Sequence, residues 1–249
     1  MIIMRLIFVS VIKEGRMKTI GLIGGMSWES TVPYYKMIND EYAGKELGGL
    51  HSARIILYSV DFYELEKHMS AGEWYSIAEI LLDAAKRLET AGADVILICT
   101  NTMHKLFPGI QEKISVPMIH IADATADELE KNNIKKVVLL GTKYTMTEDF
   151  YKSRLTERGF EVLVPDEEDI ELVNSVIFNE LCKGIIKDNS RSAYVSIIEK
   201  LKNAGAEGVI LGCTEIGMLI RQEDVVIPVF DTTEIHSLSA ARYACSEIS

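Results

Sequence analysis

Two stretches of this chain decide its fold: AGADVILICTNT at residues 91–102 and AGAEGVILGCTE at residues 204–215. In each, a glycine turn leads into a short strand of apolar residues, and a cysteine followed by a hydroxyl residue ends that strand. A single stretch of this kind is common in α/β proteins, where parallel strands alternate with amphipathic helices. Its recurrence after 113 residues indicates that the chain repeats a β/α unit.

Two further pairs of matching segments flank these stretches in the same order. KTIGLIGG at residues 18–25 matches KKVVLLGT at 135–142, and VPMIHIADAT at 116–125 matches IPVFDTTE at 227–234. The three offsets are 117, 113 and 111 residues, so the register drifts little over half the chain. Three matches in one order predict a duplicated β/α domain.

Short β-branched runs alternate with longer amphipathic stretches from Met17 onward. Strands are expected at residues 19–23, 54–59, 94–99, 117–120, 136–140, 160–164, 208–211 and 227–230. Helices are expected near residues 29–43, 73–91, 104–113, 121–132, 147–158, 167–183, 190–204, 215–221 and 232–246. The predicted fold class is α/β, with two pseudo-symmetric domains that each hold a small parallel sheet flanked by helices. The active site is expected in the cleft between them, at the carboxyl ends of the strands.

The domain boundaries follow from the repeat. We expect a first α/β domain at residues 17–118 plus 230–249 and a second at 119–229. Residues 1–16 read as an N-terminal extension, because their apolar run is too short to span a bilayer and lacks a small-residue cleavage site. The folded part is expected to begin at Met17.

Composition excludes several classes of protein. The 249 residues carry 26 Lys and Arg against 37 Asp and Glu, a net charge of -11, and 48% are hydrophobic, which is ordinary for a globular protein. This acidity and the lack of a basic run argue against nucleic acid as a partner. The four cysteines form no CxxC, which argues against a disulfide scaffold and favours a reducing, cytoplasmic location. The five histidines form no HxH or HExxH pattern, so no metal is expected.

Cys99 and Cys213 end the matched strands, so duplicated halves facing one another would bring two thiols to one pocket from opposite sides. We expect a helix after each cysteine, with Thr100, Asn101 and Thr214 as candidate N-cap residues. A helix N-terminus favours a thiolate, the form needed in a base or nucleophile. Cys182 and Cys245 lack this setting and are expected to be packing residues.

Two opposed thiols can form a two-base site. One thiolate removes a proton from a carbon, the other thiol returns a proton to the opposite face, and the stereocentre inverts. A disulfide between them is the poorer reading, because the sulfurs would have to meet across a cleft that also binds ligand, in a reducing compartment.

Three motifs carry a family resemblance: GLIGGMSW at 21–28, CTNTMHK at 99–105 and GCTEIG at 212–217. They resemble the aspartate/glutamate racemase family, within the wider aspartate, glutamate and hydantoin racemase group, over nearly all of residues 17–249. The likeness is greatest to the enterobacterial amino-acid racemases that carry GGMSWEST. It implies a cofactor-independent racemase, often a homodimer, that acts on a small acidic amino acid with Cys99 and Cys213 as the acid/base pair.

The resemblance also assigns roles to the neighbouring residues. It implies that the substrate carboxylate and amino group are held by Thr100, Asn101, Thr102 and Thr214. It places the remaining wall of the site at Met26, Ser27 and Thr142. Glu215 either orients and activates Cys213 or is a surface carboxylate at a helix N-terminus.

A cation is expected for the side-chain carboxylate of an acidic substrate. Lys143 is the preferred candidate over Arg54 and Lys183, although most such side chains are solvated surface charges. His104 either contacts the substrate or lies on a helix surface.

Departures from the family pattern leave the reaction partly open. Ser27-Trp28 replaces the Gly-Pro of many aspartate racemases, so broad specificity is an alternative, and Glu215 replaces the histidine usual in cell-wall glutamate racemases. Other members of the superfamily isomerise maleate or decarboxylate a malonate, and a non-catalytic amino-acid sensor is a further alternative. No GxGxxG or GxxxxGK[ST] occurs, and no lysine is singled out for pyridoxal phosphate, so no cofactor is expected. No membrane partner is expected either, because the apolar run within residues 1–16 is too short to span a bilayer.

Overall fold

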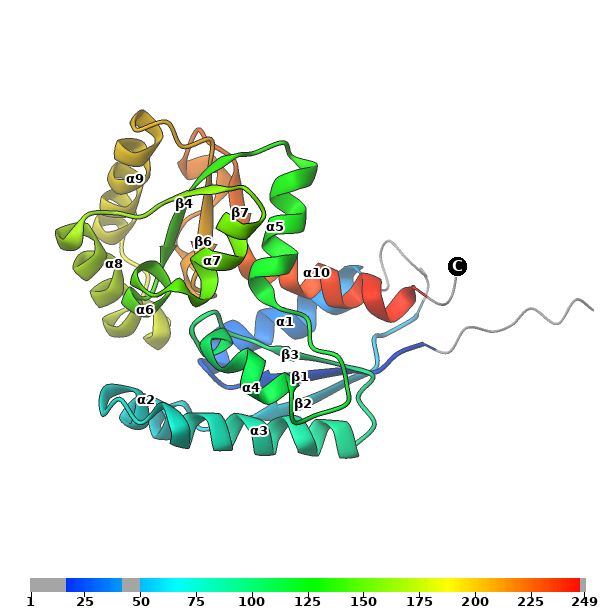
Figure 1. Cartoon of the computed structure of the whole chain (residues 1–249). Coiled ribbons are helices and arrows are strands. Elements are labelled where there is room, and N and C mark those ends of the chain that lie inside the picture. Colours follow the sequence, from blue (N-terminus) through cyan, green and yellow to red (C-terminus); the bar gives the residue numbers. More distant parts are fainter. Residues whose placement is uncertain (1–16, 42–49, 247–249) are drawn as a thin grey trace, which may run out of the picture.

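The computed structural model describes residues 17–41 and 50–246, and it arranges them as two parallel sheets flanked by helices (Figure 1). The first sheet has the order β2-β1-β3 and the second the order β5-β4-β6-β7. The strands are β1 (Ile20–Gly24), β2 (Ile55–Ser59), β3 (Val95–Ile98), β4 (Lys136–Gly141), β5 (Glu161–Leu163), β6 (Gly208–Gly212) and β7 (Val229–Asp231). The predicted N-terminal extension, residues 1–16, lies outside the described residues.

Ten α-helices occur in the described part of the chain. They are α1 (Trp28–Glu41), α2 (Phe62–Ser70), α3 (Trp74–Thr90), α4 (Phe107–Gln111), α5 (Ile121–Lys131), α6 (Lys143–Thr147), α7 (Asp149–Glu157), α8 (Glu167–Asn179), α9 (Asp188–Asn203) and α10 (Thr232–Cys245). Short 3₁₀ turns are η2 (Thr102–Leu106), η3 (Leu181–Lys183), η4 (Ile216–Met218) and η5 (Gln222–Asp224). Within residues 17–41 and 50–246, no helix is both long enough and apolar enough to cross a bilayer.

The predicted α/β fold with two sheets is confirmed, and the repeat is visible in the strand order. β1 pairs in parallel with β2 and β3, as β4 pairs with β5 and β6. In the second half β7 adds a fourth strand, whereas the predicted strand at 117–120 is reduced to one bridge between Ile96 and Met118. That strand prediction is therefore wrong, although the segment occupies the place that β7 has in the other half.

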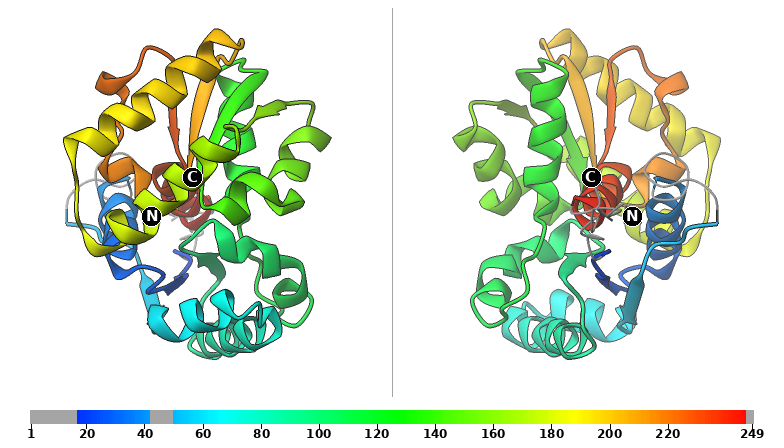
Figure 2. Two further views of the ribbon diagram at one scale, coloured as in Figure 1. Left: turned by 90° about the vertical axis from the view of Figure 1, so that its left-hand side faces the viewer. Right: turned by 90° about the vertical axis from the view of Figure 1, so that its right-hand side faces the viewer.

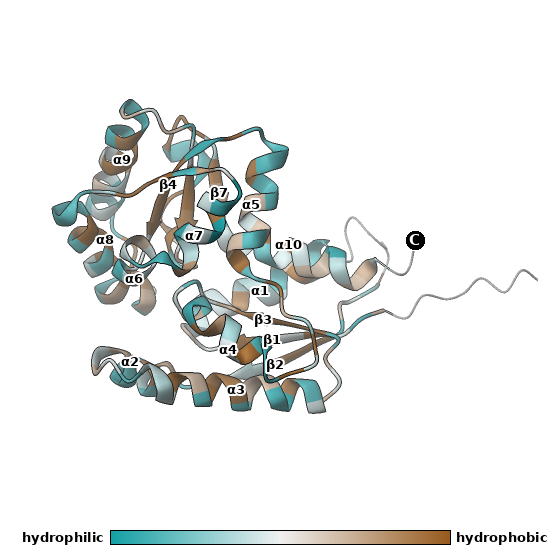
Figure 3. Cartoon of the chain, viewed as in Figure 1, coloured by the Kyte–Doolittle hydropathy of each residue, from teal (hydrophilic) through white to brown (hydrophobic). Residues whose placement is uncertain are grey.

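Alternating strand residues bury both faces of each sheet. In the first sheet, Leu22 and Leu97 face α1 and α10, while Ile96 and Ile98 face α3. The second sheet is covered by α8 and α9 on one face and by α5 and α7 on the other. Apolar residues accordingly concentrate on the strands, and the outer faces of the helices are more hydrophilic (Figure 3). Continuous apolar strands of this kind are typical of parallel sheets covered on both sides.

The chain crosses between the two sheets twice (Figure 2). It leaves the first sheet before α5 and returns through α10, which packs on α1. The predicted boundary between residues 229 and 230 falls inside β7, which belongs to the second sheet.

Helix α2 is not among the helices predicted from the sequence. Asp61 is its N-cap residue and accepts a hydrogen bond from the backbone N–H of Tyr63 at 3.0 Å.

Candidate active site

The loops that follow the strands of the two sheets meet at the carboxyl ends of those strands. Ser27, after β1, contacts Glu215, after β6, and Thr102, after β3, contacts Thr142, after β4. Asn101 reaches Thr232, the first residue of α10. These contacts join residues far apart in the sequence. They place the segments that follow Cys99 and Cys213 in one region between the sheets.

Cys99 lies directly after β3 and is fully buried. Its backbone N–H donates to the Ile23 carbonyl at 2.9 Å, which extends the pairing of β3 with β1. Its side chain belongs to the apolar cluster formed with α1 and α10. Burial raises the pKa of the Cys99 thiol above its ordinary value, because a thiolate is poorly solvated there.

Cys213 lies directly after β6, and its thiol has a carboxylate partner. Its Sγ donates to Glu215 Oε2 at 3.0 Å. Burial first, and then the negative charge of Glu215, raise the pKa of Cys213 well above its ordinary value. The residue before it must be glycine, since a Cβ at Gly212 would stand 2.7 Å from the Leu140 carbonyl oxygen of β4.

The expectation that helix N-termini would favour both thiolates is wrong. The segments after the cysteines are 3₁₀ turns of five and three residues, η2 and η4, rather than α-helices. Asn101 and Glu215 hold the N-cap positions of these turns, but neither side chain makes a capping hydrogen bond. Such short turns develop little dipole, so burial determines the direction of the pKa shift of both thiols.

Glu215 is 2% exposed, so its interpretation as a surface carboxylate is also wrong. Oε1 accepts from the Ser27 hydroxyl at 2.8 Å and from the Ser27 N–H at 3.3 Å. Oε2 accepts from Thr214 Oγ1 at 2.9 Å as well as from the Cys213 thiol. A buried carboxylate with four donors is solvated by the protein in place of water.

Asn101 occupies the position in the first half that Glu215 has in the second. Its amide nitrogen donates to Thr232 Oγ1 at 3.0 Å, and Thr232 Oγ1 donates to the Leu211 carbonyl at 2.7 Å. The amide oxygen of Asn101 is buried and has no hydrogen-bond partner among residues 17–41 and 50–246. A buried acceptor without a partner is costly unless a ligand satisfies it, so this atom marks a place for a donor group.

The other predicted site residues have varied surroundings. Thr102 Oγ1 and Thr142 Oγ1 are 2.9 Å apart, and Thr142 also caps α6 by accepting from the Thr145 N–H. Thr100 is half-buried, and its carbonyl accepts a hydrogen bond from His104. Met26 is buried in the apolar cluster that includes α3.

Lys143 is exposed at the start of α6, and its ammonium group pairs with Glu171 in α8. It lines a cavity of about 500 Å³ whose walls also include Met69, at the end of α2, and Phe178. The structure therefore puts Lys143 at a groove between the two halves, without a contact to either cysteine. Arg54 precedes β2, at the opposite end of the first sheet, and Lys183 is exposed in η3.

Three buried histidines near Cys99 were not predicted as a group: His104, His120 and His236. The ring centroids of His104 and His120 are 4.6 Å apart, and those of His104 and His236 are 5.7 Å apart. For one of the three, His120, the repeat contains a signal: His120 matches Asp231, and the two residues are the N-caps of α5 and α10.

His104 is buried in η2, so its interpretation as a helix-surface residue is wrong. It is 1% exposed, its Nδ1 donates to the Thr100 carbonyl at 2.8 Å, and its Nε2 accepts from the Ile121 N–H at 3.2 Å. Burial lowers the pKa of His104 to about 3 and that of His236 to about 4. Within residues 17–41 and 50–246, no three metal-ligating side chains gather to form a metal site.

Comparisons with known proteins identify the family and the fold. The sequence profile described as Asp/Glu/Hydantoin racemase matches residues 23–240. The broad specificity amino-acid racemase RacX of Bacillus subtilis is 27% identical over 223 residues, which cover 86% of this chain and 92% of RacX.

Two solved structures are also similar over most of their length. A provisionally assigned Asp/Glu racemase from Yersinia pestis is 54% identical with a TM-score of 0.84, over 92% of this chain and 99% of that one. An aspartate racemase homologue from Pyrococcus horikoshii is 43% identical with a TM-score of 0.79, over the same shares of the two chains.

Proposed function

The chain belongs to the Asp/Glu/hydantoin racemase family and is a racemase-type enzyme, and on this premise we propose that Cys99 and Cys213 exchange protons with an amino-acid Cα from opposite faces. The observation that carries this proposal is the 3.0 Å hydrogen bond from the Cys213 thiol to buried Glu215. It supplies an acceptor for the thiol proton in a site that otherwise disfavours a thiolate.

The proton transfers follow from this contact. Glu215 Oε2 takes the proton of Cys213, and the resulting thiolate removes the α-proton of the substrate. The Cys99 thiol then gives its proton to the opposite face of Cα, so the carbon keeps four bonds and its configuration inverts. Glu215 now carries a proton and Cys99 is a thiolate; after product release Glu215 loses this proton to solvent and Cys99 takes one up, which restores the site. No cofactor is needed, because the carbanion is formed and quenched by these side chains in a buried site.

The substrate we propose is aspartate or glutamate. The unpartnered Asn101 amide oxygen accepts a hydrogen bond from the α-ammonium group. Hydroxyl and amide groups of Thr100, Thr102, Thr142 and Thr214 surround the α-carboxylate, next to Met26, whereas both donors of Ser27 are taken by Glu215. Lys143, which lines the neighbouring groove, pairs with the side-chain carboxylate in place of Glu171.

Broad amino-acid specificity is the second candidate. The observation in its favour is that the ammonium group of Lys143 already has a carboxylate partner in Glu171. A site that leaves this pair intact would make no demand for an acidic side chain. We further propose a cytoplasmic location, because the widely spaced cysteines fit a reducing compartment. By analogy with the family, we propose a homodimer.

Incubation of the pure protein with single enantiomers in deuterium oxide tests the function. We expect deuterium at Cα and loss of optical rotation with L-aspartate or L-glutamate, and chiral chromatography of an amino-acid panel then measures the specificity. Exchange with none of the amino acids would exclude a racemase. Ligand-induced thermal stabilisation without turnover would instead indicate a binding protein.

A further inference from the structure

Ser27 makes the contact that reaches Glu215 from the other half of the molecule. It follows β1 in the first half, is 3% exposed, and donates to Glu215 Oε1 through both its hydroxyl and its backbone N–H. The two residues are 188 positions apart in the sequence. The orientation of the Cys213 partner therefore depends on a residue of the first sheet's loop.

The loop that carries Ser27 is itself tightly held. The Ser27 carbonyl accepts from Thr31 Oγ1 at 2.7 Å, and Thr31 Oγ1 accepts from the Gly25 N–H at 2.9 Å. Gly25 has a φ of +91°, and a Cβ there would stand 2.2 Å from the Val60 carbonyl oxygen, so only glycine fits. Ser27 is thus a fixed donor, and its hydroxyl is occupied by Glu215.

The two oxygens of Glu215 are divided between the halves of the molecule. Both hydrogen bonds to Oε1 come from Ser27, while Oε2 accepts from Thr214 and Cys213 of its own loop. A carboxylate that is held at one oxygen cannot rotate the other oxygen away from the thiol. Burial first, and also the negative charge of Glu215, raise the pKa values of Tyr34 in α1 and Cys182 in η3. Both side chains therefore stay neutral.

We propose that Ser27 is a positioning residue that fixes Glu215 so that Oε2 receives the proton of Cys213. This inference rests on the proposed racemase function and adds a one-sided element to it. The residue matched to Glu215 in the first half is Asn101, which is not a carboxylate, so the Cys99 thiol has no equivalent partner there. Ser27 accordingly supports proton transfer on the Cys213 face of the substrate alone.

The test is Ser27→Ala, with exchange in deuterium oxide measured separately from each enantiomer. Loss of a hydrogen bond to a charged group predicts a decrease of about 10- to 100-fold in the exchange of the enantiomer served by Cys213. Exchange of the other enantiomer is expected to keep its rate within about 3-fold, well below the one-face effect. A merely structural role would slow both enantiomers equally, and that result would overturn the proposal.

Three further variants keep the test falsifiable. Ser27→Thr retains the hydroxyl, so the enantiomer that exchanges slowly in Ser27→Ala is expected to exchange at the wild-type rate. Glu215→Gln is expected to slow the exchange of that same enantiomer and not of the other. Ser30→Ala is the matched control, because Ser30 is a buried hydroxyl in the first turn of α1 that donates to the Ser27 carbonyl at 3.3 Å and does not contact Glu215. One-sided loss in Ser30→Ala would contradict the proposal.

A measurement without substrate separates this inference from the proposed function. The rate of Cys213 alkylation is followed against pH by mass spectrometry, in the wild type and in Ser27→Ala. Removal of the Ser27 donor leaves the Glu215 charge less compensated, so the alkylation profile is expected to move to higher pH. If the wild type shows no exchange but the profile moves, the racemase function fails and the positioning role stands. If the wild type exchanges and neither readout changes in Ser27→Ala, the positioning role fails.

Discussion

Cys99 and Cys213 occupy matched places in a duplicated fold, but their surroundings differ in charge. Cys213 donates to a buried carboxylate, Glu215. Among the described residues, no carboxylate forms a hydrogen bond with the Cys99 thiol, and its neighbours are apolar side chains and the neutral phenol of Tyr34. The duplication has preserved the strand, the thiol and the following threonine, while the next position has diverged to Asn101 and Glu215.

This difference teaches that a symmetric backbone need not give two equivalent bases. Burial disfavours the thiolate at both sites. Among the described residues, a carboxylate that accepts the thiol proton is hydrogen-bonded to Cys213 and not to Cys99. This difference supports the proposal that Cys213 begins the reaction as a base and Cys99 as an acid.

Removal of each thiol is expected to have the largest effect. In Cys99→Ala and in Cys213→Ala, racemisation should fall by about 10²- to 10⁴-fold, because each variant loses one proton-transfer group. Each variant should still exchange the α-proton of one enantiomer, and the two variants should differ in which one. Chiral chromatography and deuterium incorporation measure both effects.

Cys245→Ala is the control for this pair, since Cys245 is a buried packing residue of α10. Its racemisation rate is expected to match the wild type. If either Cys99→Ala or Cys213→Ala keeps full activity, the two-base reaction is refuted, and single-cysteine chemistry of the maleate isomerase or malonate decarboxylase kind is favoured.

Acid is expected to destabilise the Cys99 side through its neutral histidines. His104 donates to the residue after Cys99, and His236 Nδ1 lies 3.0 Å from the Tyr34 hydroxyl. Their pKa values of about 3 and about 4 lie below the unfolded value, so the unfolded state binds more protons as the pH falls below about 6.5. Stability is therefore full above that pH and falls toward pH 4, with a loss on the order of 3 kcal/mol from His236 alone.

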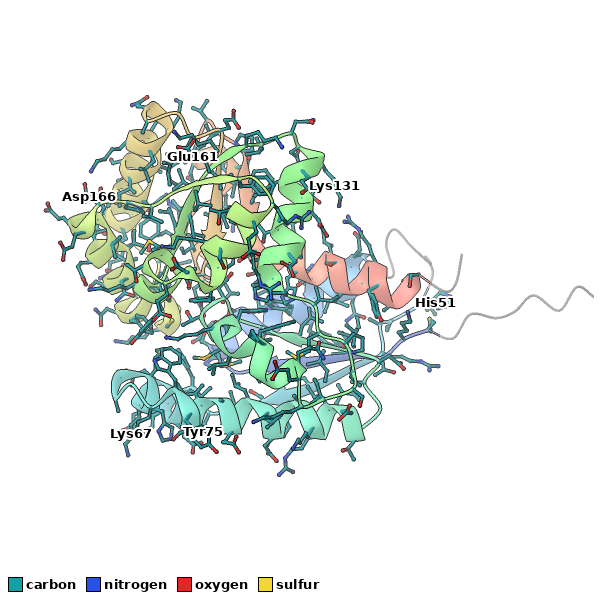
Figure 4. All side chains as sticks on the ribbon, in the orientation of Figure 1. His51, Lys67, Tyr75, Lys131, Glu161 and Asp166 are labelled. Carbon is teal, nitrogen blue, oxygen red and sulfur yellow. The ribbon has the colours of Figure 1, made fainter. Side chains whose placement is uncertain are left out.

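Denaturant unfolding at a series of pH values measures this loss. In His236→Gln, the slope of unfolding free energy against pH in this window should fall by about 1.4 kcal/mol per pH unit. His51→Gln is the control, because His51 is exposed and lies at the periphery of the molecule (Figure 4). An unchanged slope in His236→Gln would show that this histidine does not titrate with unfolding.

The repeat in the sequence was enough to predict the two parallel sheets and the place of both cysteines. The positions of the strands follow from apolar periodicity, which is local information. The predicted strand at 117–120 failed because its neighbour pairing is a single bridge, which depends on packing rather than on the residues alone. Helix α2 is not predicted by the apolar pattern, although Asp61 provides an N-cap signal.

The chemistry of the site was less predictable than its location. A glutamate after Cys213 is consistent with either a surface cap or a buried partner, and only the approach of Ser27 from 188 residues away distinguishes them. The histidines were equally ambiguous, because burial by residues distant in the sequence lowers their pKa values. Long-range contacts set the protonation of this site, and sequence periodicity does not encode them.

Lys143 gives the smallest expected effect and sharpens the comparison of the halves once more. The repeat matches it to Met26, a buried apolar residue, so a charged group follows the second glycine turn alone. In Lys143→Gln, we expect KM for aspartate and glutamate to rise by about 3- to 10-fold at unchanged kcat, since an exposed charge pair is weak. KM for neutral amino acids should not change, and Lys36→Gln, which removes another exposed lysine paired with an acid, is the control. Equal KM values for acidic substrates in the wild type and Lys143→Gln would remove the cation from the acidic-substrate proposal and favour broad specificity.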